Sequence, residues 1–145
     1  MTDQRKWLIC GIGEELFGID LACVIEIIYK PTIIRLSSFN QSVAGIVEWQ
    51  GFEVPVVDYS AVGNNSEMKI NWGEIKRPVI LLELGKCRLG LLVDSISEIA
   101  ADTMKQSLKI DPLIESKIKE LKGVIEHDDN IIFILDPNKL AEMVL

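Results

Sequence analysis

The sequence is poor in the residues that build metal centres, disulfide frameworks and nucleic-acid surfaces. Histidine occurs once, as His127, and none of its candidate partners shares a ligand spacing with another, so no metal site is expected. The three cysteines, Cys10, Cys23 and Cys87, form no Cys-x-x-Cys pair and lie in apolar runs, which indicates buried thiols in a reducing compartment. Basic residues number 15 against 22 acidic ones, and the net charge of -7 argues against a nucleic-acid partner.

Long hydrophobic runs are also lacking. No apolar run approaches the roughly 18 residues that a membrane-spanning helix needs. The first apolar run is broken by Gly11, Gly13 and Glu14, which is unlike a signal peptide. We therefore expect a cytoplasmic protein without direct membrane insertion. With 145 residues, 48% of them hydrophobic, the chain suits a single domain over 1–145, in which two small lobes can share a core.

The most informative stretch is 45–58, GIVEWQGFEVPVVD, in which two apolar runs flank a turn that contains Gly51. Glycine readily takes the positive φ that a tight hairpin turn needs. A second copy of this pattern, GVIEHDDNIIFILD, occupies 123–136, which is 78 positions further along the chain. Both stretches are predicted to form β-hairpins.

The segments upstream of these hairpins match as well, because 7–27 aligns with 79–99 at an offset of 72 positions. We interpret the chain as an internal repeat of 7–58 and 79–136, with the junction loop in the polar stretch 64–76. Glycines recur at the same places of the two copies, and they are predicted to be structural turns: Gly18, Gly45, Gly90 and Gly123.

Local signals predict the remaining elements. Hairpins are expected over 7–19 and 79–93, and an irregular strand over 25–34 lies at a sheet edge because Pro31 interrupts it. Asp20 is a candidate N-cap for one helical turn, and Asp136 followed by Pro137 favours a C-terminal helix. Short helical segments are further expected at 59–63 and from Pro112.

Each half thus offers five short strands in about 70 residues, which suits a small SH3-like barrel. So small a barrel leaves part of its core exposed and needs a neighbour to cover it. We therefore expect a mainly β fold, in which two pseudo-equivalent five-stranded SH3-like barrels, one from each half, pack together. Short helices accompany them, including one at the C-terminus.

The sequence carries little catalytic chemistry. Asp58 and Asp136 occupy equivalent places in the two copies, which resembles the carboxylate pair of aspartic proteases. The Thr-Gly that follows the catalytic aspartate there is absent, so roles as caps or turn formers are favoured. Neither a phosphate-binding glycine loop nor a Gly-x-Ser-x-Gly elbow occurs. We predict a protein that is not an enzyme and needs no cofactor.

Four pieces of the sequence, in order, resemble the CheW-like coupling proteins of bacterial chemotaxis. They are FGID at 17–20 with Val24 and Glu26, the hairpin 45–58, GLLVD at 90–94, and Gly123-Val124 with ILD at 134–136. Together they span almost the whole chain. The resemblance implies a CheW-like domain of two SH3-like barrels with a hydrophobic seam, in agreement with the repeat.

The resemblance also implies a function. CheW-like proteins are non-enzymatic adaptors that couple the cytoplasmic tips of methyl-accepting chemoreceptors to the regulatory domain of a CheA-type histidine kinase. In the family, the receptor tip lies in the groove between the barrels, and the kinase domain packs barrel to barrel against the adaptor. The implied location is the cytoplasm, at membrane receptor arrays. The candidate groove residues of this chain are Val24, Glu26, Trp49, Gln50 and Gly51.

Two departures from the family pattern affect the expected receptor contact. The family usually shows Asn-Leu-Arg-Gly where this chain has EWQG at 48–51, so Gln50 replaces an arginine and its fork of donors. Asn40 stands where proline is common. The alternatives left open are an adaptor of another motility pathway, a small-molecule sensor that uses the groove, and a hydrolase built on Asp58 and Asp136. Val24 as a core residue and Glu26 as a solvated one also remain open.

Overall fold

The computed structural model describes residues 5–35, 43–58, 77–101, 120–142 and 144 of the chain. Over these ranges the strands are β1 (Lys6–Ile12), β2 (Glu15–Asp20), β3 (Val24–Ile28), β4 (Val43–Trp49), β5 (Phe52–Asp58), β6 (Val79–Leu84), β7 (Cys87–Leu92), β8 (Ser95–Ala101), β9 (Leu121–His127) and β10 (Asn130–Leu135). The helical elements are the 3-10 turn η1 (Leu21–Cys23) and α3 (Pro137–Glu142). Asn40, the predicted junction 64–76 and the helical segments at 59–63 and from Pro112 lie outside the described residues.

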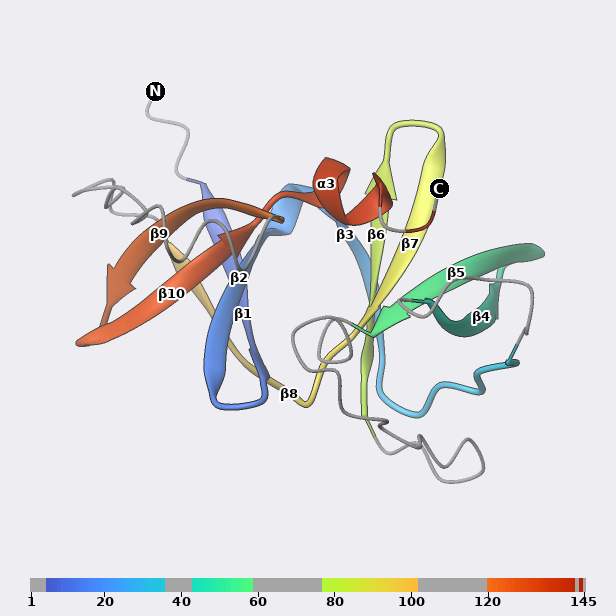
Figure 1. The fold of residues 1–145 in the computed structure, drawn as a ribbon, viewed down its shortest axis with the longest axis horizontal. Coiled ribbons are helices and arrows are strands. Elements are labelled where there is room, and N and C mark those ends of the chain that lie inside the picture. Colours follow the sequence, from blue (N-terminus) through green and yellow to red (C-terminus); the bar gives the residue numbers. More distant parts are fainter. Residues whose placement is uncertain (1–4, 36–42, 59–76, 102–119, 143, 145) are drawn as a thin grey trace.

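The strands form two five-stranded sheets, in the orders β8-β1-β2-β10-β9 and β3-β6-β7-β5-β4. We call the lobe of the first sheet barrel A and the lobe of the second barrel B. Figure 1 shows the two lobes side by side, with α3 above the junction between them. The predicted fold of two small packed barrels with a C-terminal helix is confirmed. Among the described residues, no helix is long and apolar enough to span a bilayer.

The assignment of one barrel to each half of the sequence is wrong. β1 and β2 belong to barrel A, whereas β3, β4 and β5 of the same half belong to barrel B, and the second half divides in the opposite sense. The chain crosses between the lobes after β2, through η1, and again after β7. Parallel pairs, β2 with β10 and β5 with β7, join the two halves within each sheet.

The two sheets use the same pairing register. Ile134 lies opposite Gly18 in the parallel pair of β10 and β2, and Val56 lies opposite Gly90 in the pair of β5 and β7. These pairs are related by the offsets of 78 and 72 positions found in the sequence. The internal repeat stays a prediction, and the shared register agrees with it.

The four recurring glycines are not turns, contrary to the prediction. Gly18, Gly45, Gly90 and Gly123 lie within β2, β4, β7 and β9. A Cβ on Gly18 or Gly90 would approach a core side chain to 2.8 or 2.9 Å. These two positions therefore give room to neighbouring branched side chains rather than reversing the chain. Gly51 is the turn glycine that the sequence predicted, with a φ of 83°.

Within the described part of the chain, the hydrophobic core has three parts. The largest cluster lies between the sheets, where Leu8 and Ile19 of barrel A meet Ile80 and Leu91 of barrel B. Leu140 of α3 is fully buried in it, so the C-terminal helix seals the junction. Each of the two smaller clusters contacts the strands of a single sheet. One lies in barrel B and the other in barrel A. Because the junction is apolar, neither lobe is expected to be stable without the other.

Both predicted helix caps are confirmed. Oδ1 of Asp20 accepts a hydrogen bond from the backbone N–H of Ala22 at 3.0 Å, at the start of η1. Oδ1 of Asp136 accepts one from the N–H of Asn138 at 2.9 Å, and Pro137 occupies the first helical position of α3. Each carboxylate satisfies a backbone donor that the short helical segment leaves without a partner.

Candidate protein-binding surface

Two of the predicted groove residues meet at the seam of barrel B, between the edge strands β3 and β4. The indole Nε1 of Trp49 donates a hydrogen bond to Oε2 of Glu26 at 2.5 Å. Beside this contact, the backbones of Ile34 and Ile46 form an isolated antiparallel bridge. Glu26 is exposed but not merely solvated, because its carboxylate accepts this hydrogen bond from the opposite edge strand of the sheet.

The β4–β5 turn projects next to this seam. Gln50 and Gly51 have φ values of 47° and 83°, and both residues are exposed. Two consecutive positive φ values are typical of the two-residue hairpin turn whose twist matches that of the flanking strands. The turn therefore presents Gln50 to solvent in a fixed place.

An arginine that the sequence reasoning missed lies against the same hairpin. The guanidinium carbon of Arg88 lies 4.1 Å from the ring centroid of Phe52 and 5.6 Å from that of Trp49. Phe52 is 50% exposed. Within the described ranges, Arg88 forms no ion pair with a carboxylate. Its buried Nε has no hydrogen-bond partner. The guanidinium is thus held over aromatic rings, and its terminal amino groups, rather than the buried Nε, are the donors that an incoming acceptor could reach.

We call Glu26, Trp49, Gln50, Gly51, Phe52 and Arg88 together the turn surface. Arg88 reaches it because β7 pairs in parallel with β5, with Gly90 opposite Val56. The recurrence of Gly18 and Gly90 was the one signal in the sequence for the parallel register of β5 and β7. That recurrence does not point to Arg88 unless the parallel pairing is already known.

Val24, the remaining groove candidate, lies two residues before Glu26 on β3. Its side chain is half-buried and packs against the cluster between the barrels. Val24 is therefore partly a core residue, which was one of the two alternatives for it. Part of its side chain remains accessible.

Asp58 and Asp136 do not share a site. Asp58 is 1% exposed, and its two carboxylate oxygens each accept a hydrogen bond from Arg77 at 3.3 Å. Asp136 instead caps α3. An aspartic-protease mechanism needs two carboxylates that share one proton. Their separate contacts argue against the hydrolase hypothesis.

Arg77 extends this contact to the other lobe. Its Nε lies 2.9 Å from Oδ1 of Asp94 and forms an ion pair with it. The geometry is not that of a hydrogen bond, because the N–H does not point at the oxygen. Oδ2 of Asp94 in turn accepts a hydrogen bond from the N–H of Gly13 at 2.6 Å. Arg77 therefore links the end of β5 in barrel B to the β1–β2 turn of barrel A.

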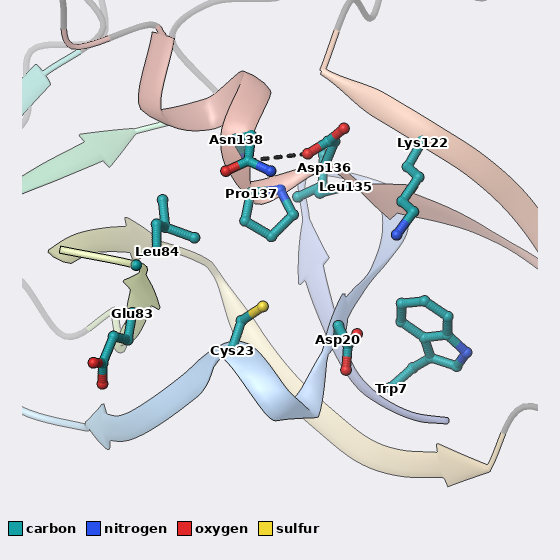
Figure 2. Close-up of a pocket in the computed structure, with 11 residues that line it drawn as sticks. Trp7, Asp20, Cys23, Glu83, Leu84, Lys122, Leu135, Asp136, Pro137 and Asn138 are labelled. Atoms are coloured by element: carbon teal, nitrogen blue, oxygen red, sulfur yellow. Dashed lines mark hydrogen bonds between the residues drawn. The ribbon is translucent and has the colours of Figure 1, made fainter. Parts of the chain in front are cut away.

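A pocket of about 310 Å³ lies where the end of the barrel A sheet faces the β6–β7 hairpin and α3. Figure 2 shows Asp20, Cys23, Asp136 and Lys122 among its lining side chains. Burial raises the pKa of the Cys23 thiol, Asp20 and Asp136 add to this effect, and Lys122 opposes it. A neutral thiol is a weak nucleophile, so the pocket favours binding over covalent chemistry. It contains none of the turn surface.

The cysteines differ in exposure. Cys10 is buried as predicted, and burial raises its pKa to about 12. Cys87 is exposed, so the prediction of a buried thiol is wrong there. It is the first residue of β7, directly after the turn, where the strand has not yet entered the core.

Comparison with known proteins identifies the family. Residues 6–144 match the sequence profile of the CheW-like domain. The chain belongs to the CheW-like family. It is 25% identical over 143 residues to a chemotaxis protein CheW of Klebsiella aerogenes, a match that covers 96% of this chain and 82% of that protein. A chemotaxis protein CheW of Treponema pallidum is 24% identical over 141 residues, covering 95% of this chain and 82% of that protein.

The fold agrees with a solved CheW structure. The scaffolding protein TtCheW from Thermoanaerobacter tengcongensis superposes with a TM-score of 0.79 at 22% sequence identity, over 93% of this chain and 86% of that one. The family resemblance found in the four sequence pieces is confirmed. CheW-like proteins are non-catalytic scaffolds of chemotaxis, and this chain has their fold over nearly its full length.

Proposed function

We propose that this CheW-like chain is a cytoplasmic adaptor that couples methyl-accepting chemoreceptor tips to the regulatory domain of a CheA-type histidine kinase, at receptor arrays. It catalyses no reaction and needs no cofactor in this role. The observation that carries the proposal is the turn surface, which supplies a prepared protein-binding site on a chain of this family.

The composition of the turn surface suits a helical partner. Trp and Arg are the residues that most often dominate binding energy in protein interfaces. Here Trp49 is fixed by Glu26, and Arg88 is fixed by stacking on Phe52, so little side-chain freedom is lost when a partner binds. An amphipathic helix could place its apolar face on Phe52 and an acidic side chain on Arg88.

The groove between the barrels extends the proposed site. Val24 and Ile27 of β3 are half-buried and pack against the cluster between the sheets. They offer apolar area beside Glu26 without opening the core. We place the receptor hairpin along this strand, with its end at the β4–β5 turn.

Arg88 offers a reason why Gln50 is tolerated in the turn. The family usually has an arginine there, whereas this chain holds a guanidinium over the same hairpin from the neighbouring strand β7. In this proposal the positive charge is kept near the turn but enters from another element. The receptor served by this chain would then carry its acidic residue at a shifted position.

Arg88→Gln is expected to weaken binding of a soluble receptor-tip hairpin about tenfold, or about 1.4 kcal/mol, since it removes the charge and the fork of donors. Titration calorimetry measures this with the full chain. Lys86→Gln is the matched control, because Lys86 is exposed in the nearby β6–β7 turn. Unchanged affinity of Arg88→Gln, or an equal loss in the control, would remove the turn surface from the receptor site.

A small-molecule sensor is the second candidate function, and the pocket beside Cys23 is the observation that favours it. Its volume of about 310 Å³ lies at the lower end of the usual range for ligand sites. A ligand that binds only the folded state raises the melting temperature, and above the dissociation constant the stabilisation grows with the logarithm of ligand concentration. Such a rise with one member of a metabolite panel would favour the sensor, and its absence would favour the adaptor alone.

A further inference from the structure

The seam of barrel A brings together three side chains with metal-binding atoms. Glu98 lies on the edge strand β8, His127 ends the opposite edge strand β9, and Asp128 follows in the β9–β10 turn. Nε2 of His127 lies 3.3 Å from Oε1 of Glu98 and 3.3 Å from Oδ2 of Asp128. The three donor atoms lie within 4.8 Å of one another. No spacing in the sequence indicated this set, because barrel closure brings Glu98 to His127.

The spacing of these atoms suits a tetrahedral ion. Zinc binds histidine nitrogen and carboxylate oxygen at about 2.0–2.2 Å, and tetrahedral ligands at that distance lie about 3.3–3.6 Å apart. Both contacts of His127 Nε2 have this separation. The oxygens of Glu98 and Asp128 lie within 4.8 Å of each other, and both side chains are exposed, so a bound ion could draw them closer.

The equivalent place in barrel B is joined by a single hydrogen bond and, among the described residues, has no set of metal-binding side chains. Glu26 and Trp49 hold the positions that the offsets of 72 and 78 relate to Glu98 and His127, and there one indole N–H donates to one carboxylate. In barrel A the residue after the ring is Asp128 instead of Gln50, which adds a second carboxylate. One ring nitrogen carries at most one proton, so the two carboxylates would have to share that proton in a bifurcated hydrogen bond. A cation in their midst satisfies all three groups.

We propose that Glu98, His127 and Asp128 bind one divalent transition-metal ion of the Zn²⁺ class, with water completing its coordination. One imidazole and two carboxylates are donors that suit Zn²⁺, Co²⁺ or Ni²⁺. The ion would tie β8 to the β9–β10 turn and so close barrel A. The site is distinct from the turn surface and does not depend on the proposed partners.

The test is a Zn²⁺ titration of the full chain with Cys87→Ser as the background, because the exposed Cys87 thiol would otherwise compete for the metal. We expect one ion per chain with a micromolar dissociation constant. Asp128→Asn should weaken binding at least about tenfold, since it removes one ligand charge. Asp129→Asn, in the same turn, should leave the affinity unchanged.

His127→Gln supplies a second arm. Zn²⁺ should raise the melting temperature of the background protein and leave that of His127→Gln unchanged. Because His127 also contacts Glu98 across the seam, its variant is checked for folding by far-ultraviolet circular dichroism. Asp128→Asn avoids this problem, since Asp128 is exposed and Asn tolerates its φ of 50°. No saturation below millimolar Zn²⁺, or equal affinity in Asp128→Asn and the background, would overturn the site.

Discussion

Gly45→Ala is expected to lower the free energy of unfolding by about 3 kcal/mol. A Cβ at this position would lie 2.3 Å from the carbonyl oxygen of Ile34 and 2.8 Å from Cγ2 of Ile33. That oxygen also accepts a hydrogen bond from the N–H of Ile46 at 2.8 Å, within the bridge beside the seam of barrel B. Because the obstacle is backbone rather than a flexible side chain, the two segments must separate.

Urea unfolding followed by circular dichroism measures this loss. Gly123→Ala is the matched control, because Gly123 holds the corresponding position in β9 and a Cβ there meets nothing within 4 Å. It should change the free energy of unfolding by about 0.5 kcal/mol or less. Equal losses in the two variants would mean that the approach of Ile34 does not limit position 45.

Arg77→Met is expected to cost about 3 kcal/mol of stability, because the carboxylate of Asp58 would remain buried without its guanidinium. Asp58 is 1% exposed and receives two hydrogen bonds from Arg77. The same change removes the ion pair with Asp94 that holds the β1–β2 turn. Arg77→Lys should recover part of the loss, since it keeps the charge but not the paired donors.

Unfolding of the single and double variants separates these contributions. Asp94→Asn should cost less than about 1 kcal/mol, since the Asp94 side chain is 43% exposed. Arg77→Met combined with Asp58→Asn should lose less than the sum of the two single changes, because the residues act on each other directly. Additive losses would contradict a role for Arg77 in stabilising the buried Asp58.

The parts of the fold that the sequence predicted are local. The turn at Gly51 and the caps at Asp20 and Asp136 depend on residues within a few positions of one another. The strand predicted over 25–34 is shorter than expected, because β3 ends at Ile28, before Pro31, but it is the edge strand of barrel B as predicted. The turn and the caps could be predicted because they depend on residues close in the sequence.

The parts that it did not predict depend on distant pairing. Which hairpins share a sheet is decided by the parallel registers of β2 with β10 and β5 with β7, and no turn residue encodes them. The same pairing explains why Gly18 and Gly90 lie in strands and why Arg88 reaches the turn surface. Glu26 and Trp49 were chosen through the family resemblance, whereas their hydrogen bond follows from barrel closure.

An adaptor must bind two proteins at once. Titration of the full, folded chain with the regulatory domain of a CheA-type kinase, alone and with a soluble receptor-tip hairpin present, tests whether this chain does so. We expect saturable binding of the kinase domain at tens of micromolar or below, and a ternary complex when all three proteins are mixed. A folded and soluble chain that associates with neither protein in this range would contradict it.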